Sequence, residues 1–491
     1  MNSSHRANRP TRQALLGQLC LVAALILFPG CALWDAANGS DDDPADASDV
    51  AQFDTLAADA DSRDADEPEV VEADATDDVG ADTAEEPHAF KSCLSTEAVY
   101  PLEVGAPKPQ FHPRVAFDGH AIWVVYARGS ALDATALEIF ATRITCDSGF
   151  LAETWQVSTL PILEVDPVPS IDIVGGTVHM VWHSDVDTGA ADRSKVAYRS
   201  FGVDGEPKMD AEVYVDFVVP GGGAGAFHDF YTADIVGLSE GEALIAAVSD
   251  DNIGEMRVVL QKVSHLGEAR GQAVAVPSTS NAIQLRPSVA ASASGPIWAA
   301  WLEAATDGLS GYLIKSSAFD RSTLGATEQP MTSNSRASIQ VGPRHVNGVL
   351  EDESVYFVQQ TDALAGRLYS ANRAGDVSAF GSDDANNIFP SLASHGRGGA
   401  VAWFSRTNTD PDQQRQLMVQ TFRDSGSVTT MGVAQAIARV DAPLTKKLPG
   451  GPEIISIGGH YYFVVAQDGG TTSSTALKGR FVKLPAQADA D

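Results

Sequence analysis

The chain has 491 residues, of which 44% are hydrophobic, and its formal net charge is −32 at pH 7. This length allows one large or several small globular domains, and the hydrophobic fraction is sufficient for a folded core. The acidic balance and the absence of any basic stripe in the sequence argue against nucleic-acid binding.

The first thirty residues have the composition of a targeting segment. Arg6, Arg9 and Arg12 form a basic stretch, and an apolar run follows over residues 14–28. This run is too short for a confident membrane span, and it leads into acidic sequence rather than into a basic stop-transfer flank. We therefore predict that residues 1–30 are a signal peptide.

The end of this segment, LFPGC over residues 27–31, resembles the lipobox of bacterial lipoproteins. Gly30 and Cys31 match that motif, whereas Phe28 and Pro29 depart from it. The resemblance implies that Cys31 becomes the lipidated N-terminus, carrying acyl chains such as palmitate. It also implies an outer-membrane location, because Ala32 rather than aspartate follows the cysteine. The alternative is an ordinary cleaved signal peptide with an incidental cysteine.

An acidic segment separates the targeting segment from the rest of the chain. Between residues 32 and 90 there are twenty Asp or Glu residues against a single Arg63, with almost no aromatic residues. Such a composition cannot bury enough apolar surface to offset the entropy lost on ordering. We predict that residues 31–89 are a disordered linker that tethers the folded part, and that residues 486–491 are a disordered tail.

The four cysteines fall into separate classes. Cys20 lies in the signal segment and Cys31 in the lipobox, which leaves Cys93 and Cys146 in the mature chain. An even pair in an oxidising compartment predicts a disulfide. Two buried thiols are the alternative.

A recurring motif organises the remaining sequence. Residues 169–182 read PSIDIVGGTVHMVW, which predicts a strand, a Gly-Gly turn and a second strand. Related motifs occupy residues 113–126, 231–248, 287–301, 343–359, 390–403 and 452–465. Successive copies lie roughly 45 to 65 residues apart, a spacing typical of propeller blades.

Each copy continues into a third alternating strand, a turn and a short fourth strand. The third strands are predicted at residues 138–145, 194–201, 256–263, 312–319, 366–371, 416–422 and 476–483. Seven such units predict an all-β chain, a seven-bladed β-propeller of four-stranded blades over residues 90–485. An array of β-sandwiches is the alternative, but it needs about a hundred residues per domain. The last unit lacks a fourth strand, which we expect residues 95–104 to supply.

The loops that lead into the first strands carry the candidate ligand-binding residues. Arginine binds carboxylates in a bidentate manner, and aromatic rings stack on sugars. The candidates are Arg114, Arg286, Arg344, His112, His228 and Asp166. The alternative is that these loops are polar only because they are exposed.

One loop suggests a metal ion. Asp185 and Asp187 stand at alternate positions before Gly189, a spacing that calcium loops use. Further ligands of such a loop are missing, so a solvated turn without an ion is the alternative. Apart from possible Ca²⁺ at this loop, we expect no cofactor.

Enzymatic motifs are weak. The turn that contains Asp147 and Gly149 resembles the Asp-box of sialidase-type propellers, but Trp155 of the following Thr-Trp pair lies too far along the chain. As a whole, the chain resembles lipid-anchored propeller proteins with acidic linkers from the envelope of Gram-negative bacteria. This resemblance implies a propeller fold and a location on the outer membrane, facing the periplasm or the cell surface. Our first hypothesis for the function is a monomeric module that binds an envelope protein, peptide or glycan. A sialidase-like carbohydrate-active enzyme is the alternative.

Overall fold

The structure is a computed structural model of the chain. It describes residues 90–94, 98–103, 109–129, 137–160, 162, 167–187, 192–218, 229–238, 241–250, 256–277, 283–291, 297–304, 312–319, 328–333, 339–343, 355–360, 368–371, 377–381, 385–395, 398–407, 415–424, 429–440, 451–468 and 476–484. The predicted signal peptide (1–30), linker (31–89) and tail (486–491) lie outside these residues.

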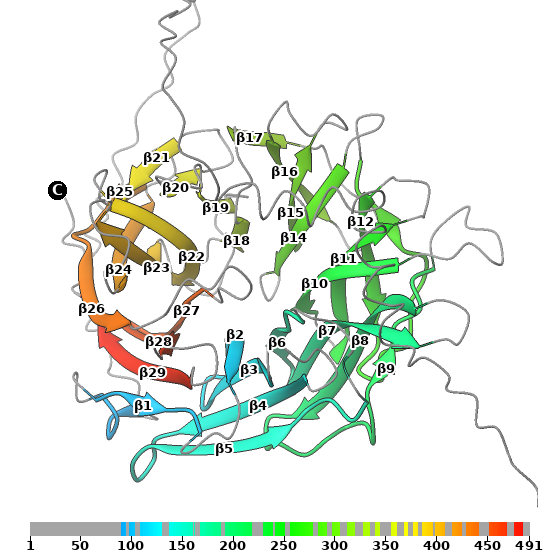
Figure 1. Cartoon of the computed structure of the whole chain (residues 1–491), viewed down its shortest axis with the longest axis horizontal. Coiled ribbons are helices and arrows are strands. Elements are labelled where there is room, and N and C mark those ends of the chain that lie inside the picture. Colours follow the sequence, from blue (N-terminus) through cyan, green and yellow to red (C-terminus); the bar gives the residue numbers. More distant parts are fainter. Residues whose placement is uncertain are drawn as a thin grey trace, which may run out of the picture. The chain divides into compact units, whose positions relative to one another are not determined.

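The described residues form seven antiparallel sheets, six of four strands and one of five (Figure 1). In each sheet, three strands that are consecutive in sequence lie side by side. The first strands are β2 (Gln110–Phe117), β6 (Ser170–Val174), β10 (Asp229–Gly237), β14 (Ile283–Ala291), β18 (Ile339–Pro343), β22 (Ala385–His395) and β27 (Glu453–Gly458). The second strands are β3 (Ile122–Arg128), β7 (Thr177–Asp187), β11 (Ala243–Asp250), β15 (Ile297–Ala304), β19 (Val355–Gln360), β23 (Gly398–Thr407) and β28 (Tyr461–Asp468).

The remaining strands complete each sheet on its outer side. The third strands are β4 (Glu138–Thr145), β8 (Asp192–Gly202), β12 (Met256–Val263), β16 (Tyr312–Phe319), β20 (Leu368–Ala371), β24 (Arg415–Asp424) and β29 (Ala476–Lys483). The fourth strands are β5 (Leu151–Gln156), β9 (Val213–Tyr214), β13 (Val274–Ala275), β17 (Glu328–Ser333), β21 (Val377–Phe380), β25 (Thr429–Met431) and β1 (Tyr100–Pro101). In the sixth sheet, β26 (Gln435–Val440) also pairs with β24. The predicted all-β class and four-stranded antiparallel units are confirmed.

The first strands link the sheets to one another in chain order. β2 contacts β6, β6 contacts β10, and the series continues through β14, β18, β22 and β27. β27 in turn contacts β2, so the series of contacts returns to its starting strand.

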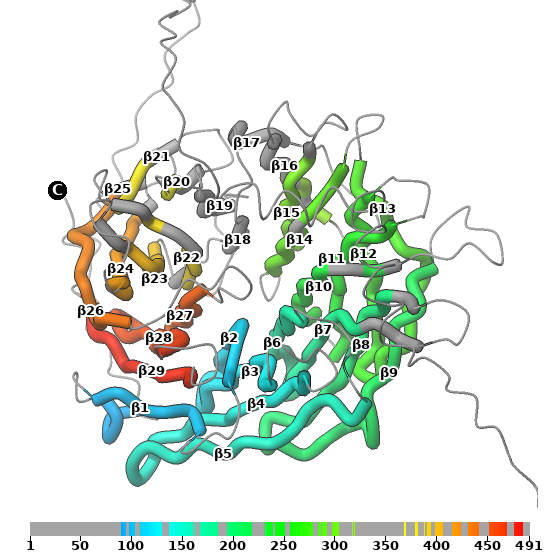
Figure 2. Tube along the Cα trace, in the orientation of Figure 1, coloured from blue at the N-terminus to red at the C-terminus, as the bar shows by residue number. Residues whose placement is uncertain are grey.

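The last sheet is completed from the other end of the sequence. β1 pairs with β29, with Tyr100 opposite Gly479 and Pro101 opposite Lys478. In Figure 2 the blue β1 runs beside the red β29. The prediction that residues 95–104 contain the missing fourth strand is confirmed for its described part, and this pairing covers an edge that would otherwise be exposed.

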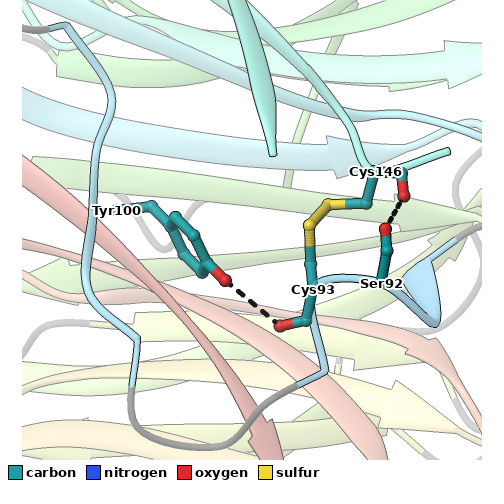
Figure 3. Close-up of a disulfide and its surroundings, with 4 residues drawn as sticks. All are labelled: Ser92, Cys93, Tyr100 and Cys146. Atoms are coloured by element: carbon teal, nitrogen blue, oxygen red, sulfur yellow. Dashed lines mark hydrogen bonds between the residues drawn. A yellow bond between two sulfur atoms is a disulfide. The ribbon is translucent and has the colours of Figure 1, made fainter. Parts of the chain in front are cut away.

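A disulfide fastens this closing segment to the first sheet. Cys93 precedes β1, Cys146 directly follows β4, and their Cα atoms are 5.8 Å apart in the bonded pair (Figure 3). The Ser92 hydroxyl donates to the Cys146 carbonyl, and the Tyr100 ring stacks on Phe150 with centroids 4.2 Å apart. The disulfide predicted from the sequence is thus present, in preference to two buried thiols.

The core lies between neighbouring sheets and consists of the second strands and their partners. Trp123 of β3 and Trp182 of β7 are almost fully buried in one cluster that also contains Ile171. Met180 lies in the same cluster, whereas Val181 packs in a cluster with the third sheet. Second strands therefore bury both of their faces, and their side chains are apolar almost throughout.

No helix among the described residues is long and apolar enough to cross a membrane.

Candidate ligand-binding pocket

Arg114, the first candidate from the sequence, lies in β2 and is engaged by the last sheet. Its guanidinium forms an ion pair and hydrogen bond with the Glu453 carboxylate at the start of β27. The Glu453 side chain is 8% exposed and that of Arg114 35% exposed. Arg114 therefore serves first as a link between two sheets.

This pair belongs to a set of polar side chains at equivalent positions of the first strands. Each follows an irregularity in β2, β10 or β22, or opens β6 or β27. We call this set the inner polar belt; it comprises Arg114, Ser170, Asp234, Ser391 and Glu453. Bonds along the belt run from sheet to sheet: Ser170 Oγ donates to Asp234 Oδ1 at 2.6 Å, and Ser391 Oγ donates to Glu453 Oε2 at 3.0 Å.

The charges of the belt explain how Arg114 stabilises the ionised form of Glu453. Burial raises the pKa of the Glu453 carboxyl, and the nearby Asp234 charge acts in the same direction. Arg114 and the Ser391 hydroxyl oppose this rise. The belt is thus a set of mutually satisfied groups, which is the usual condition for a buried carboxylate.

The other candidates near the first strands are not brought together in the described part of the chain. His112 is buried, with a left-handed φ of 49°, at the irregularity in β2. Arg286 falls at the matching irregularity of β14. His228, Asp166 and Arg344 lie outside the described residues.

The proposed calcium loop is a strand. β7 continues through Asp187, so that Asp185 lies opposite Ser194 and Asp187 opposite Asp192. The sequence predicted a loop here because the polar residues gave no apolar alternation, but the hairpin pairing extends beyond the apolar part of β7. Among the described residues, no group of three His, Cys, Asp or Glu side chains is placed to hold a metal ion.

An open pocket lies at the other ends of these strands, between the second and third sheets. It has a volume of about 510 Å³ and is lined by Gly175, Thr177, Lys208, Gly241 and His265. All five belong to the turns that follow first or third strands or to the residues beside these turns. The pocket is therefore at the opposite end of the sheets from the loops that the sequence favoured.

The local sequence explains how these turns form. Gly175 and Gly176 have φ of 54° and 73° between the paired residues Val174 and Thr177. A two-residue hairpin with both central residues at positive φ requires glycine at little steric cost. The tight turn leaves Thr177 as the first residue of β7, on the face that looks toward the third sheet.

Two basic side chains line the pocket. The Lys208 ammonium donates to Thr177 Oγ1 at 2.5 Å. Among the described residues, no carboxylate forms an ion pair with Lys208 or with the His265 ring.

His179 lies next along the same face of β7, two residues after Thr177. Its ring is fully buried, its Nδ1 and the Tyr198 hydroxyl share a hydrogen bond of 2.7 Å, and its Nε2 has no partner among the described residues. Burial, together with the positive charges of Lys208 and His265, lowers the pKa of His179 to about 4. His179 is thus a neutral imidazole near neutral pH, close to both basic residues of the pocket.

The carboxyl group opposite His179 forms a hydrogen bond that links two sheets. Asp172 is the cross-strand partner of His179, and its Oδ2 accepts a hydrogen bond from the Gly237 backbone N–H at 2.6 Å. Burial raises the pKa of Asp172 to about 6, and the Asp234 charge contributes in the same direction. Asp172 therefore ties β6 to β10 rather than neutralising the pocket.

The third sheet contributes a wall that rests directly on the second. Gly267 has a φ of 75° in the turn after β12, and a Cβ added there would overlap Val213 and the Tyr198 ring. This close approach seats His265 over the neighbouring sheet. Leu266 and Val213 are 41% and 36% exposed beside this turn, so apolar surface adjoins the basic residues.

Sequence reasoning missed this pocket. The turns after the third strands were interpreted only as hairpins, although two of them carry Lys208 and His265 shortly after or before the turn glycine. A comparison of the same turn in adjacent repeats, rather than of the loops before the first strands, would have placed these two basic residues together.

Comparisons with known proteins show that the backbone of this chain is similar to those of several solved structures. No protein-family model matches the chain, and no curated protein matches it either. A protein of unknown function from Dyadobacter fermentans DSM 18053 has a TM-score of 0.47 and 10% identity, covering 79% of this chain and 99% of that chain. The polysaccharide lyase Uly1 has a TM-score of 0.48 and 10% identity, covering 79% of this chain and 100% of that chain. The phage phi92 endosialidase has a TM-score of 0.44 and 9% identity, covering 81% and 70%. At these values no activity is carried over from these proteins.

Proposed function

We propose that this protein is a lipid-anchored binding module of the bacterial outer envelope, built on a seven-bladed β-propeller. The seven sheets, the contacts that run from β2 through β27 and back to β2, and the closing strand β1 support this fold. The lipobox-like sequence that ends at Cys31 supports the anchor. The module binds its ligand between the second and third blades, at the end where the turns after their first and third strands lie.

The pocket there is the observation that carries the binding function. Ligand sites are usually concave, and volumes of about 300 to 1,000 Å³ are typical. A pocket of about 510 Å³ between two sheets, with polar and basic side chains at its wall and apolar surface beside it, has these properties. Its side chains come from turns, where substitution changes recognition without disturbing the core.

A sialidase-like enzyme is the alternative, and the described residues favour it less. The notion of an arginine cluster for a substrate carboxylate depends on Arg114, Arg286 and Arg344. Arg114 is held by the buried carboxylate of Glu453, whose charge it balances. The basic residues of the pocket have no such structural partner among the described residues.

Filling the pocket is expected to abolish binding. The full chain, purified in detergent, is applied to a glycan array and to immobilised envelope extract, beside a His265→Trp variant. Because the indole fills space at the pocket wall, retention of the bound component should fall by at least about tenfold, as for loss of a central contact. The matched control is His120→Trp, an exposed histidine in the turn between β2 and β3 of the first sheet.

Equal retention by His265→Trp and by the unsubstituted protein would move the binding site away from this pocket. No retained component on either surface would count against the binding module, and conversion of a fluorogenic glycoside panel would then favour the enzyme.

The anchor is tested separately at Cys31. In the Cys31→Ser variant, expressed in a Gram-negative host, the protein should leave the outer-membrane fraction, because a lipid chain contributes about 0.8 kcal/mol of membrane affinity per buried CH₂ group. Incorporation of an alkyne-labelled palmitate should be lost at the same time. Unchanged membrane association with no label in either protein would show that Cys31 is not acylated.

A further inference from the structure

The pocket between the second and third sheets has the chemistry of an oxyanion site. Lys208 lies in the loop that folds back on β8, where its backbone N–H donates to the Ser200 carbonyl at 3.0 Å. Its ammonium has three donors, of which one is directed to Thr177 Oγ1. The remaining donors are available at the pocket wall in the described structure.

His265 brings the second donor from the neighbouring sheet. Its backbone carbonyl accepts a hydrogen bond from Ser200 Oγ at 2.5 Å, which fixes this turn against β8. The exposed ring lines the same pocket as Lys208. Donors from two separately held turns thus meet at one place, as in a preorganised site.

Two carboxylates of these turns, those of Asp204 and Glu268, are engaged elsewhere. Asp204 Oδ1 accepts from the Glu206 backbone N–H at 3.2 Å, within its own turn. Glu268 pairs with Arg270, with an N–O distance of 3.2 Å, on the far side of the Gly267 turn. Intramolecular neutralisation of Lys208 and His265 by these acids is therefore not observed.

A second, independent observation comes from His179, on the same face of β7 as Thr177. His179 is fully buried, and its Nε2 has no hydrogen-bond partner among the described residues. An unpaired buried nitrogen costs free energy, so native structures rarely keep one without a reason. It lies on the same strand face as Thr177 and feels the charges of both Lys208 and His265, which places it next to the pocket.

We propose that this pocket binds an oxyanion, the carboxylate or phosphate of a small ligand, with Lys208, His265 and Thr177 as its donors. This inference depends on the binding function proposed above, since it names the ligand class of that same pocket. Hydrogen bonds in which both partners are charged are the strongest in proteins. Leu266 and Val213 give an apolar surface beside the charged group, which suits the ring or chain that carries the oxyanion.

Calorimetric titration of the full chain in detergent tests the proposal. The probes are inorganic phosphate, glucose 6-phosphate, glucuronate and glucose, all at one ionic strength so that general screening is constant. Glucuronate and glucose differ only in the carboxylate, so this pair tests carboxylate binding. Inorganic phosphate and glucose 6-phosphate test whether the oxyanion is a phosphate instead. At least one oxyanion should bind, and glucose should not.

The variants assign the binding to the pocket. Lys208→Met removes the charge but keeps the side-chain length, and it should weaken oxyanion binding by about tenfold or more, the usual effect of losing a charged hydrogen bond. His265→Gln should weaken it as well. The control is Lys195→Met, which removes the same charge from β8 of the same sheet and should leave affinity unchanged.

The outcomes separate the two proposals. If no oxyanion binds, or if Lys208→Met binds it as tightly as the unsubstituted protein, the oxyanion site is wrong. If envelope binding is lost in His265→Trp but is unaffected by Lys208→Met and by added oxyanions, the ligand is neutral, and only the proposed function survives. If oxyanions bind through Lys208 while no envelope component is retained, the oxyanion site stands and the envelope function does not.

Discussion

Replacement of both Cys93 and Cys146 by serine is expected to lower the free energy of unfolding by about 4 kcal/mol, the value that the chain-entropy model gives for a loop of this size. The two cysteines are 53 residues apart in sequence and join the closing segment to the first sheet. Without the bond, residues 90–94 and 98–103 are held by contacts that include the buried Phe90, the Tyr100–Phe150 stack, the Glu103–Arg128 ion pair and the short pairing of β1 with β29. Urea denaturation followed by tryptophan fluorescence measures the change.

Reduction provides the matched test of this prediction. The unsubstituted protein should lose the same free energy in the presence of a reductant, whereas the double serine variant should be indifferent to the reductant. A Cys31→Ser protein, which keeps the disulfide, should unfold like the unsubstituted protein. Identical midpoints for all proteins with and without reductant would mean that the bond adds nothing to stability.

The second large effect is expected at the belt. Arg114→Met should lower the free energy of unfolding by about 2 kcal/mol, below the 3 to 5 kcal/mol of a fully buried pair because Arg114 is partly exposed and therefore screened. The substitution leaves the Glu453 carboxylate buried without its cation. Glu453→Gln in the same background should recover part of the loss, because the remaining group is then neutral.

The pH dependence of this effect has a definite sign. Burial raises the folded-state pKa of Glu453, so its contribution is most favourable below the unfolded value of about 4.3 and is lost as pH rises through the folded-state value. Removal of Arg114, which opposes the rise, moves the folded-state pKa higher still. The difference between Arg114→Met and the unsubstituted protein should therefore be small near pH 4 and grow toward pH 7.

An arginine whose acidic partner is exposed serves as the control. Arg143 is 3.7 Å from Glu153, whose side chain is 55% exposed, and such pairs contribute at most about 1 kcal/mol. Arg143→Met should thus change stability little and show no comparable dependence on pH. An Arg114→Met protein that is fully stable but loses a glycosidase activity would contradict the structural role of Arg114 and favour the enzyme.

Much of the fold could be predicted from the sequence, because it depends on local patterns. Alternating apolar residues and Gly-containing turns predicted the bounds of β4, β12, β16 and β29 as the structure has them. The closing role of residues 95–104 followed from a missing strand in the last repeat. The loop predicted around Asp185 and Asp187 is strand backbone instead, because hairpin pairing continues into polar sequence that has no apolar period of its own; ion binding there stays a prediction.

The site was not accessible in the same way. Arg114 and Glu453 are 339 residues apart, and no local pattern indicates that one neutralises the other. Lys208 and His265 likewise come together only because the Gly267 turn of one sheet rests on Tyr198 of the next. The relative placement of sheets decides which of several polar residues keep a partner and which face a pocket.

The pairing of β1 with β29 sets an order on folding during synthesis. Tyr100 is made early, but its partner Gly479 follows 379 residues later in the sequence, so the last sheet cannot be completed until that part of the chain has been made. Cys93 and Cys146 are both available much sooner. Oxidation of this pair can therefore fix the segment that contains Cys93 and β1 beside the first sheet before β29 has been made.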